Sequence, residues 1–380
     1  MFRLPVELCL AVFSYLNVHQ LLRAQQVCHR WQQIILDSSL WPSSVHVLLR
    51  YIQVPYSNTL SGPDYENELA CDRWSISWPD WVDKEEESFD GDPQTSCQVL
   101  QTLSKGKTKS LSVNFSKGYA SRNILEMLPN FLFLEELSVH IGSISSHNLT
   151  SVLQRLPQIT TFGLHISEFH GTPMRHLKTI QLKLRRLFIE ISTHSGDASS
   201  TLHNTVANIV EHSPDLISLA VIGTGARKEW TTKLGDRIKS LTMDVDGNLP
   251  PISARGLKCL MLLTYRQHGH ELFECCACDL SSLTHLTLCG SSSGEVELSI
   301  MEAYNIGENL EFLHLGCSAT NYELFLRSPK LKELRIVDMF PLHPDICPTL
   351  QMVHYCPDCK YIDKNDRKKS KLISNHEVLR

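Results

Sequence analysis

Residues 134–139, LEELSV, carry large apolar side chains at the first, fourth and sixth positions, and this pattern returns along most of the chain. Nine further copies start at Ile159, Leu184, Leu216, Ile238, Leu257, Leu283, Leu310, Leu331 and Leu350. A weaker copy, TKSLSV, starts at Thr108. Successive copies are 19 to 32 residues apart. Because alternate residues of a strand face opposite sides, the fourth and sixth positions predict a strand with one buried face.

This spacing matches leucine-rich repeats, in which each unit adds one strand to a shared sheet. In four copies, proline stands two residues before the first apolar position, at Pro157, Pro214, Pro329 and Pro348. Proline there ends the preceding turn and favours extended structure. Amphipathic helical patterns precede two of these prolines, in residues 145–156 and 202–213. Each unit is therefore predicted to run strand, loop, helix, turn.

An α/β fold with leucines scattered by chance is the alternative to repeats. Ten aligned copies, four with proline at one fixed offset, favour the repeats. A single unit cannot bury its own apolar face, so stacked units must share a core. The sequence predicts an α/β solenoid of about eleven repeats over residues 98–356, shaped as a horseshoe with a parallel β-sheet on its concave face.

The fifth and seventh positions of each copy are expected to line that concave face. Candidate substrate-binding residues among them are His140, His165, Phe188, Glu190, Ile222, Met261 and Leu263. An exposed apolar patch with a polar rim suits a protein partner. We expect Phe188, Met261 and Leu263 to anchor a substrate, with the two histidines and Glu190 at the rim. A face filled by loops is the alternative.

The first forty-one residues are apolar and carry few charges. Helical spacing relates Leu4, Leu8, Val12 and Tyr15, and a second periodic run follows a break at residues 16–20. Pro5 suits the first turn of a helix. A segment this short buries too little surface to fold alone, so something else must cover its apolar faces.

This segment closely resembles the F-box. The matching positions are Leu4, Pro5, Glu7, Leu8, Val12, Phe13, Leu16, Leu21, Ala24, Val27, Cys28, Trp31 and Trp41. Together with the repeats, it is similar to the F-box/leucine-rich-repeat family. The resemblance implies a three-helix module that docks onto the Skp adaptor of a cullin–RING ubiquitin ligase, while the repeats hold a protein substrate. It assigns adaptor contacts to Leu4, Pro5, Leu8, Phe13, Leu16, Val27, Cys28 and Trp31. The last three are also expected to hold the helices together.

Four segments follow from these patterns: an F-box at 1–45, a linker or insertion at 46–97, repeats at 98–356, and a polar basic tail at 357–380. Within the linker, residues 78–93, WPDWVDKEEESFDGDP, hold seven carboxylates and one lysine. A solvated linker and an acidic recognition loop for a basic partner are both open interpretations. The tryptophans suggest that part of this segment packs against the first repeat.

Net charge, hydropathy and cysteine content limit the kinds of function that the sequence supports. A net charge of −5 gives no bulk electrostatic case for nucleic acid or an anionic membrane. The apolar runs are too short to cross a bilayer, and thirteen cysteines fit reduced thiols in an intracellular protein, cytoplasmic or nuclear. Cys356 and Cys359 have a zinc-knuckle spacing but lack a second pair nearby, so no metal is expected. No cofactor motif or catalytic set stands out at informative spacing.

The sequence therefore predicts a non-catalytic substrate receptor of an SCF-type ligase. The alternative is a leucine-rich-repeat scaffold whose degenerate F-box only caps the solenoid, since solenoids need capped ends. An enzyme with a thiol site has only the cysteine count in its favour.

Overall fold

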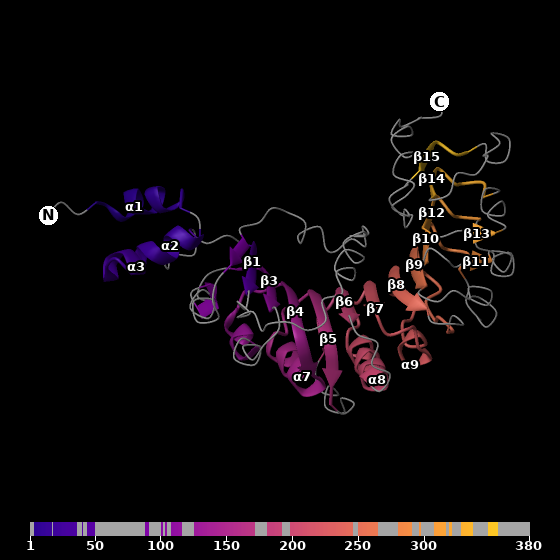
Figure 1. Cartoon of the computed structure of the whole chain (residues 1–380), viewed down its shortest axis with the longest axis horizontal. Helices are drawn as coiled ribbons and strands as arrows, with labels where there is room; N and C mark the ends of the chain where they lie inside the picture. The colour runs from indigo at the N-terminus through magenta and orange to yellow at the C-terminus, as the bar shows by residue number, and fades with distance from the viewer. Residues whose placement is uncertain are drawn as a thin grey trace, which may run out of the picture. The chain divides into compact units, whose positions relative to one another are not determined.

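The computed structural model describes residues 4–16, 18–35, 40, 44–49, 88–90, 100–101, 103–104, 108–115, 125–171, 181–191, 198–245, 250–264, 280–290, 296–297, 308–316, 319–320, 328–336 and 349–355. The chain is divided into two compact units between Pro214 and Asp215. Figure 1 gives the course of the chain and the labels of its elements.

The N-terminal segment contains three short helices, α1 (Val6–Phe13), α2 (Val18–Ala24) and α3 (His29–Ile35). Helix α3 contacts both α1 and α2. Pro5 is the residue before α1, and its carbonyl oxygen accepts a hydrogen bond from the Cys9 N–H at 3.2 Å. Proline starts the helix as its sequence position predicts.

The first unit contains a parallel sheet with the strand order β2-β1-β3-β4-β5-β6. Its strands are β1 (Ser44–Leu49), β2 (Ser88–Asp90), β3 (Ser110–Phe115), β4 (Glu136–Ser145), β5 (Thr161–His170) and β6 (Arg186–Ile191). The 3₁₀ helix η2 (Leu128–Asn130) precedes β4. Helix α7 (Ser146–Arg155) packs on β4, and α8 (Ala198–Glu211) packs on β5 (Figure 1).

The second unit repeats this arrangement, with parallel strands in the order β7-β8-β9-β10-β12-β14-β15. They are β7 (Ser218–Ile222), β8 (Ser240–Val245), β9 (Cys259–Thr264), β10 (His285–Gly290), β12 (Phe312–Gly316), β14 (Glu333–Ile336) and β15 (Met352–Tyr355). The helix α9 (Lys228–Thr231) follows β7. A separate pair consists of β11 (Val296–Glu297) and β13 (Ala319–Thr320).

The position of each strand within its repeat copy is constant. In all eleven copies, the strand begins two residues after the first apolar position, as in Ser240 after Ile238 and Cys259 after Leu257. Equivalent positions also face one another across neighbouring strands, as in the pairs Ser240–Cys259 and Cys259–His285. The prediction of a parallel sheet built from repeated strands is therefore confirmed. The mixed α/β class is confirmed with it.

The first, fourth and sixth positions of the copies form the core. In the copy that contains β4 these are Leu134, Leu137 and Val139, and in the copy that contains β10 they are Leu283, Leu286 and Leu288; all six are buried. The apolar faces of both predicted helices add to the core, with Leu149, Val152, Leu153, Leu156, Leu202, Val206, Ile209 and Val210 all buried. The side chains that helix and strand periodicity predict to face the core are thus buried.

The beginnings of the strands are joined by a repeated backbone pattern. The carbonyl oxygen of Lys239 accepts hydrogen bonds from the N–H groups of Lys258 and Cys259, each at 2.9 Å. The carbonyl of Lys258 accepts in the same way from Thr284 and His285, and the pattern continues to the last strand. In each repeat, one carbonyl oxygen therefore accepts hydrogen bonds from two N–H groups of the following repeat. These bonds fix the register of the strands at this edge.

The sheet begins earlier in the sequence than the repeats predict. Strand β1 crosses the predicted boundary between residues 45 and 46, and it pairs along its whole length with β3. Strand β2, within the predicted linker, pairs with β1. The linker therefore supplies β2 and part of β1 to the sheet. The predicted tail at 357–380, the tryptophans of the linker, and Cys356 and Cys359 lie outside the described residues.

Candidate functional site

An apolar stripe lies exposed on the N-terminal helices. Its members, which we call the N-terminal stripe, are Leu4, Leu8, Val12 and Tyr15, with 58, 52, 57 and 88% of their surface exposed. Leu8 and Val12 lie one turn apart on the same side of α1, and Leu4 and Tyr15 lie just before and just after this helix at four- and three-residue steps. Scattered exposed apolar residues are normal on a protein surface, but a contiguous row of four marks an interaction site.

The opposite side of α1 packs inward. Cys9 and Phe13 are buried, and the Phe13 ring meets Trp31 of α3 edge to face, with centroids 5.2 Å apart and planes at 72°. Phe13 was predicted as an adaptor contact, but it is 3% exposed and holds α1 against α3 instead. Leu16 is half-buried just after α1. The stripe therefore retains Leu4 and Leu8 of the predicted contacts and adds Val12 and Tyr15.

The later part of the motif holds the helices together. The Cys28 sulfur accepts a hydrogen bond from the Trp31 N–H at 3.5 Å and so caps the start of α3. The Arg30 guanidinium donates to the carbonyl oxygen of Leu4, which joins α3 to the residues before α1. Pro5, Val27 and Cys28 are exposed, and Trp31 is at the limit of exposure with 36% of its surface accessible. Trp31 has the predicted bracing role through its contact with Phe13, whereas the contact of Cys28 is with its own helix.

Comparison with protein families agrees with the resemblance of the N-terminal segment to the F-box. Residues 1–45 match the family model described as F-box-like, which covers all three helices and the N-terminal stripe. The N-terminal segment is thus an F-box-like domain. F-box domains in general bind Skp-type adaptors. A search of curated proteins finds no match to the chain.

The second candidate surface is the face of each sheet opposite the buried core positions, which we call the open face. Three apolar residues predicted to bind substrate are covered there: the expected anchors Phe188 and Leu263 are 7 and 6% exposed, and Ile222 is 4% exposed. Neighbouring strands lie about 4.8 Å apart, so bulky side chains in the middle of a sheet cover one another. Met261 is half-buried. The exposed apolar patch expected from the sequence is therefore not formed by these residues.

The predicted polar rim is a connected row on the open face of the first unit. His140 and His165 have ring centroids 3.9 Å apart, and the His165 Nδ1 lies 3.1 Å from the Glu190 Oε2. These residues come from β4, β5 and β6 at paired register positions. Partial burial, helped by the nearby His165, lowers the pKa of His140 to about 4, and Glu190 opposes this effect. His140 is therefore a neutral imidazole at neutral pH.

A second polar row on the same face comes from a position that the sequence reasoning left out. The Arg186 Nη2 lies 3.0 Å from the Glu136 Oε1, and its Nε donates to the Thr161 Oγ1 at 3.2 Å. The contacts of this guanidinium connect the three neighbouring strands β4, β5 and β6. The third position of each copy has the same strand parity as the fifth and seventh, so period-two alternation was sufficient to find it.

The open face of the second unit carries an aromatic and cationic group. The His285 and Phe312 rings stack with centroids 5.6 Å apart, and the Arg335 guanidinium lies 5.2 Å from the Phe312 ring centre. The Arg335 Nε also donates to the Glu333 Oε1 at 2.9 Å. Burial and the neighbouring Arg335 charge lower the pKa of His314 to about 4. This face combines a cation–π contact with a neutral imidazole.

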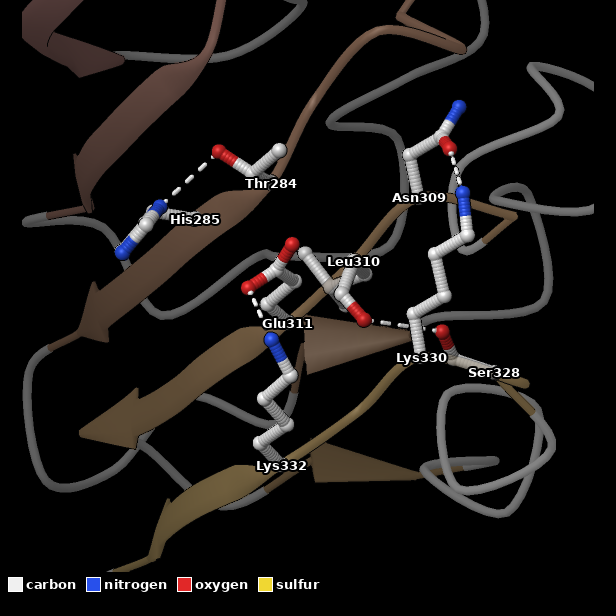
Figure 2. Close-up of polar contacts among 8 residues, drawn as sticks. All are labelled: Thr284, His285, Asn309, Leu310, Glu311, Ser328, Lys330 and Lys332. Carbon is white, nitrogen blue, oxygen red and sulfur yellow. Dashed lines mark hydrogen bonds and ion pairs between the residues drawn. The ribbon is translucent and has the colours of Figure 1, made fainter. Parts of the chain in front are cut away.

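Polar contacts also join neighbouring repeats where the strands begin. The Lys332 Nζ lies 2.7 Å from the Glu311 Oε2, and the Lys330 Nζ donates to the Asn309 Oδ1 at 2.5 Å (Figure 2). The hydrogen bond and the charge of Lys332 lower the pKa of the exposed Glu311 carboxyl. The Ser328 hydroxyl donates to the Leu310 carbonyl at 3.0 Å (Figure 2). These contacts connect consecutive repeats.

Two further observations concern the described residues alone. Within them, no cluster of three histidine, cysteine, aspartate or glutamate side chains is placed to hold a metal ion. None of the helices in that part of the chain is long and apolar enough to span a bilayer.

Proposed function

We propose that this chain is the substrate-recognition subunit of an SCF-type cullin–RING ubiquitin ligase. The F-box-like domain docks a Skp-type adaptor through the N-terminal stripe, and through it the cullin. The sheets, as a leucine-rich-repeat solenoid, bind the protein to be ubiquitinated and directed to proteasomal degradation. The observation that carries the proposal is the exposure of Leu4, Leu8, Val12 and Tyr15 within a segment that matches the F-box-like family.

The physical basis of docking is the burial of this stripe. Apolar surface gains about 25 cal/mol for each Å² removed from water. A helix that presents apolar side chains at three- and four-residue steps fits a hydrophobic groove of a partner. The interior of the segment is already occupied by Cys9, Phe13, Leu21 and Ile35. The stripe is thus available to a second polypeptide without rearrangement of the helices.

The proposed client surface is the open face of the sheets. It carries oriented polar groups, including the His140–His165–Glu190 row and the Glu136–Arg186 pair, together with the half-buried Met261. Preorganised hydrogen-bonding and charged groups favour specificity in a protein interface. We propose that these groups bind the client and that the chain itself performs no chemistry, with ubiquitin transferred by other subunits.

Affinity purification of the full chain tests this function. Leu8→Asp places a charge in the stripe at a position that is already half exposed, so the fold is retained. We expect the variant to lose Skp adaptor and cullin while it keeps its client. Gln33→Asp, at an exposed polar position of α3, is the matched control and should keep all three. Phe13→Asp is unsuitable because it would place a charge in the interior.

A deletion of residues 1–45 is also unsuitable, because β1 begins at Ser44 and would be cut. If wild type and Leu8→Asp both purify without adaptor while circular dichroism shows a folded chain, the ligase function is wrong. The chain would then be a scaffold whose F-box-like segment only caps the repeats.

A further inference from the structure

The second residue of each repeat copy lies at the edge where the strands begin, and we call these positions the edge row. In the second unit the edge row comprises Ile217, Lys239, Lys258, Thr284, Glu311, Lys332 and Gln351. The backbone hydrogen bonds described above join each member to the next, so consecutive members are neighbours in space.

At two other places in the chain, the edge row puts opposite charges side by side. Lys109 of the first unit lies 3.0 Å from Glu135, which is its neighbour in the next repeat. Glu311 and Lys332 form the same kind of pair at 2.7 Å in the second unit (Figure 2). Such cross-strand pairs of opposite charge stabilise a sheet.

Lys239 and Lys258 break this pattern, because two lysines occupy consecutive positions. The Lys239 Nζ donates to the Asp236 carbonyl at 2.9 Å, and the Lys258 Nζ donates to the Ser282 carbonyl at 3.2 Å. Neither ammonium forms an ion pair with a carboxylate among the residues that the structure describes. Like charges on neighbouring strands destabilise a sheet, and such local conflicts concentrate at functional sites.

The turns around these lysines add to the positive charge. Residues 232–240 and 250–258 contain five lysines and arginines and a single acidic residue, Asp236. One oxygen of its carboxylate, Oδ1, already accepts a hydrogen bond from the Arg255 N–H at 3.1 Å. The Arg255 side chain is exposed. These turns therefore hold one carboxylate against five cationic side chains, and one oxygen of that carboxylate is already hydrogen-bonded to the backbone.

Two details give this cationic edge a defined shape. A Cβ atom at Gly256 would approach the Lys239 Nζ to 2.5 Å, so glycine leaves room for the ammonium over the turn. Ile217, the preceding member of the edge row, is 37% exposed and offers an apolar contact beside the lysines. The surface thus combines fixed positive charge with one apolar position.

We propose that the edge formed by Ile217, Lys239, Arg255 and Lys258 binds an acidic segment of a partner protein. Carboxylates of the partner lie against Lys239, Lys258 and Arg255, and an apolar side chain at one end of the acidic segment packs on Ile217. The bound carboxylates take the place that Glu135 and Glu311 occupy in the other repeats. Charge complementarity fixes the class of partner, and adaptor docking by the F-box-like domain is independent of this edge.

Fluorescence anisotropy with the full-length protein tests the proposal. The probe is a labelled peptide of alternating Glu and Asp residues with a Leu beside the acidic run, compared with its Gln/Asn counterpart. We expect the acidic peptide to bind and the neutral peptide not to bind, with affinity falling as salt is raised. Lys258→Glu should weaken binding at least about tenfold. It should also raise the thermal midpoint, because it recreates the pairing of Lys109 with Glu135.

Lys332→Glu is the matched control, since this lysine shares the edge row but already has Glu311 as its partner. It should leave peptide affinity unchanged within about twofold, and adaptor binding should be the same in both variants. The proposal is overturned by any of three results. They are equal loss of affinity in both variants, unchanged affinity in Lys258→Glu, and tighter binding of a single-stranded RNA of equal charge than of the peptide.

Discussion

At the residue scale, the side chains of α1 and of the turn after it divide between two environments. Phe13 and Cys9 pack inward, whereas Leu8, Val12 and Tyr15 remain in water. The F-box resemblance identified the segment but did not separate these two roles, because both sets are apolar and both follow helical spacing. The contact between Phe13 and Trp31 decides which side faces inward. The separation therefore depends on packing between helices, which periodicity within one helix does not specify.

A dependence of stability on pH also arises at the residue scale. The pKa values of His140 and His314 are lowered to about 4 from 6.5. As pH falls below about 6.5, the unfolded chain takes up protons before the folded chain does, so the folded state loses stability between pH 7 and pH 4. Above pH 7 both groups are neutral in both states and contribute no pH dependence.

Urea unfolding at pH 7.5 and pH 5.0 measures this effect. In the double variant His140→Gln/His314→Gln, the loss of stability between the two pH values should be smaller by about 1 kcal/mol, after allowance for the solvent that still reaches both rings. An equal or steeper loss in the double variant would contradict the assigned shifts.

At the element scale, the helix α7 shows how a strand passes into a helix. Strand β4 ends at Ser145 and α7 begins at Ser146. The Ser145 hydroxyl accepts a hydrogen bond from the Asn148 N–H at 3.2 Å, and so satisfies one of the free donors at the helix start. Serine therefore ends the strand and caps the helix with one side chain.

Substitution of this cap has a definite expected cost. Ser145→Ala should lower the free energy of unfolding by about 1 kcal/mol, because the Asn148 N–H loses its partner. Ser145→Asp, which restores an acceptor, should recover most of the loss. Chemical unfolding followed by circular dichroism measures both variants. Equal stability of the alanine variant and the wild type would show that the cap contributes nothing.

The repeat sequence specified the elements more closely than the surfaces. Strand starts, core positions and both long helices follow from apolar spacing, because burial of those side chains is what the spacing encodes. Strands β1 and β2 did not, since neither carries the repeat pattern. The exposure of Phe188, Ile222 and Leu263 was also mispredicted. Alternation assigns a side chain to a face, but its exposure depends on the neighbouring strands.

At the scale of the whole molecule, the candidate binding surfaces lie in different parts of the chain. The apolar stripe lies on the N-terminal helices, and the polar rows lie on strands of the two units. This separation suits a receptor that must hold an adaptor and a client at once. Variants in one surface should leave the other function intact, since contacts without shared partners act additively.

The most direct test is calorimetric titration of a purified Skp-type adaptor into the full chain. We predict saturable one-to-one binding with a dissociation constant below about 1 µM and a negative heat-capacity change, because apolar surface is buried. Val12→Asp, in the exposed stripe, should weaken binding at least about tenfold. Absence of binding by folded wild-type protein, or undiminished binding by Val12→Asp, would contradict docking through the N-terminal stripe.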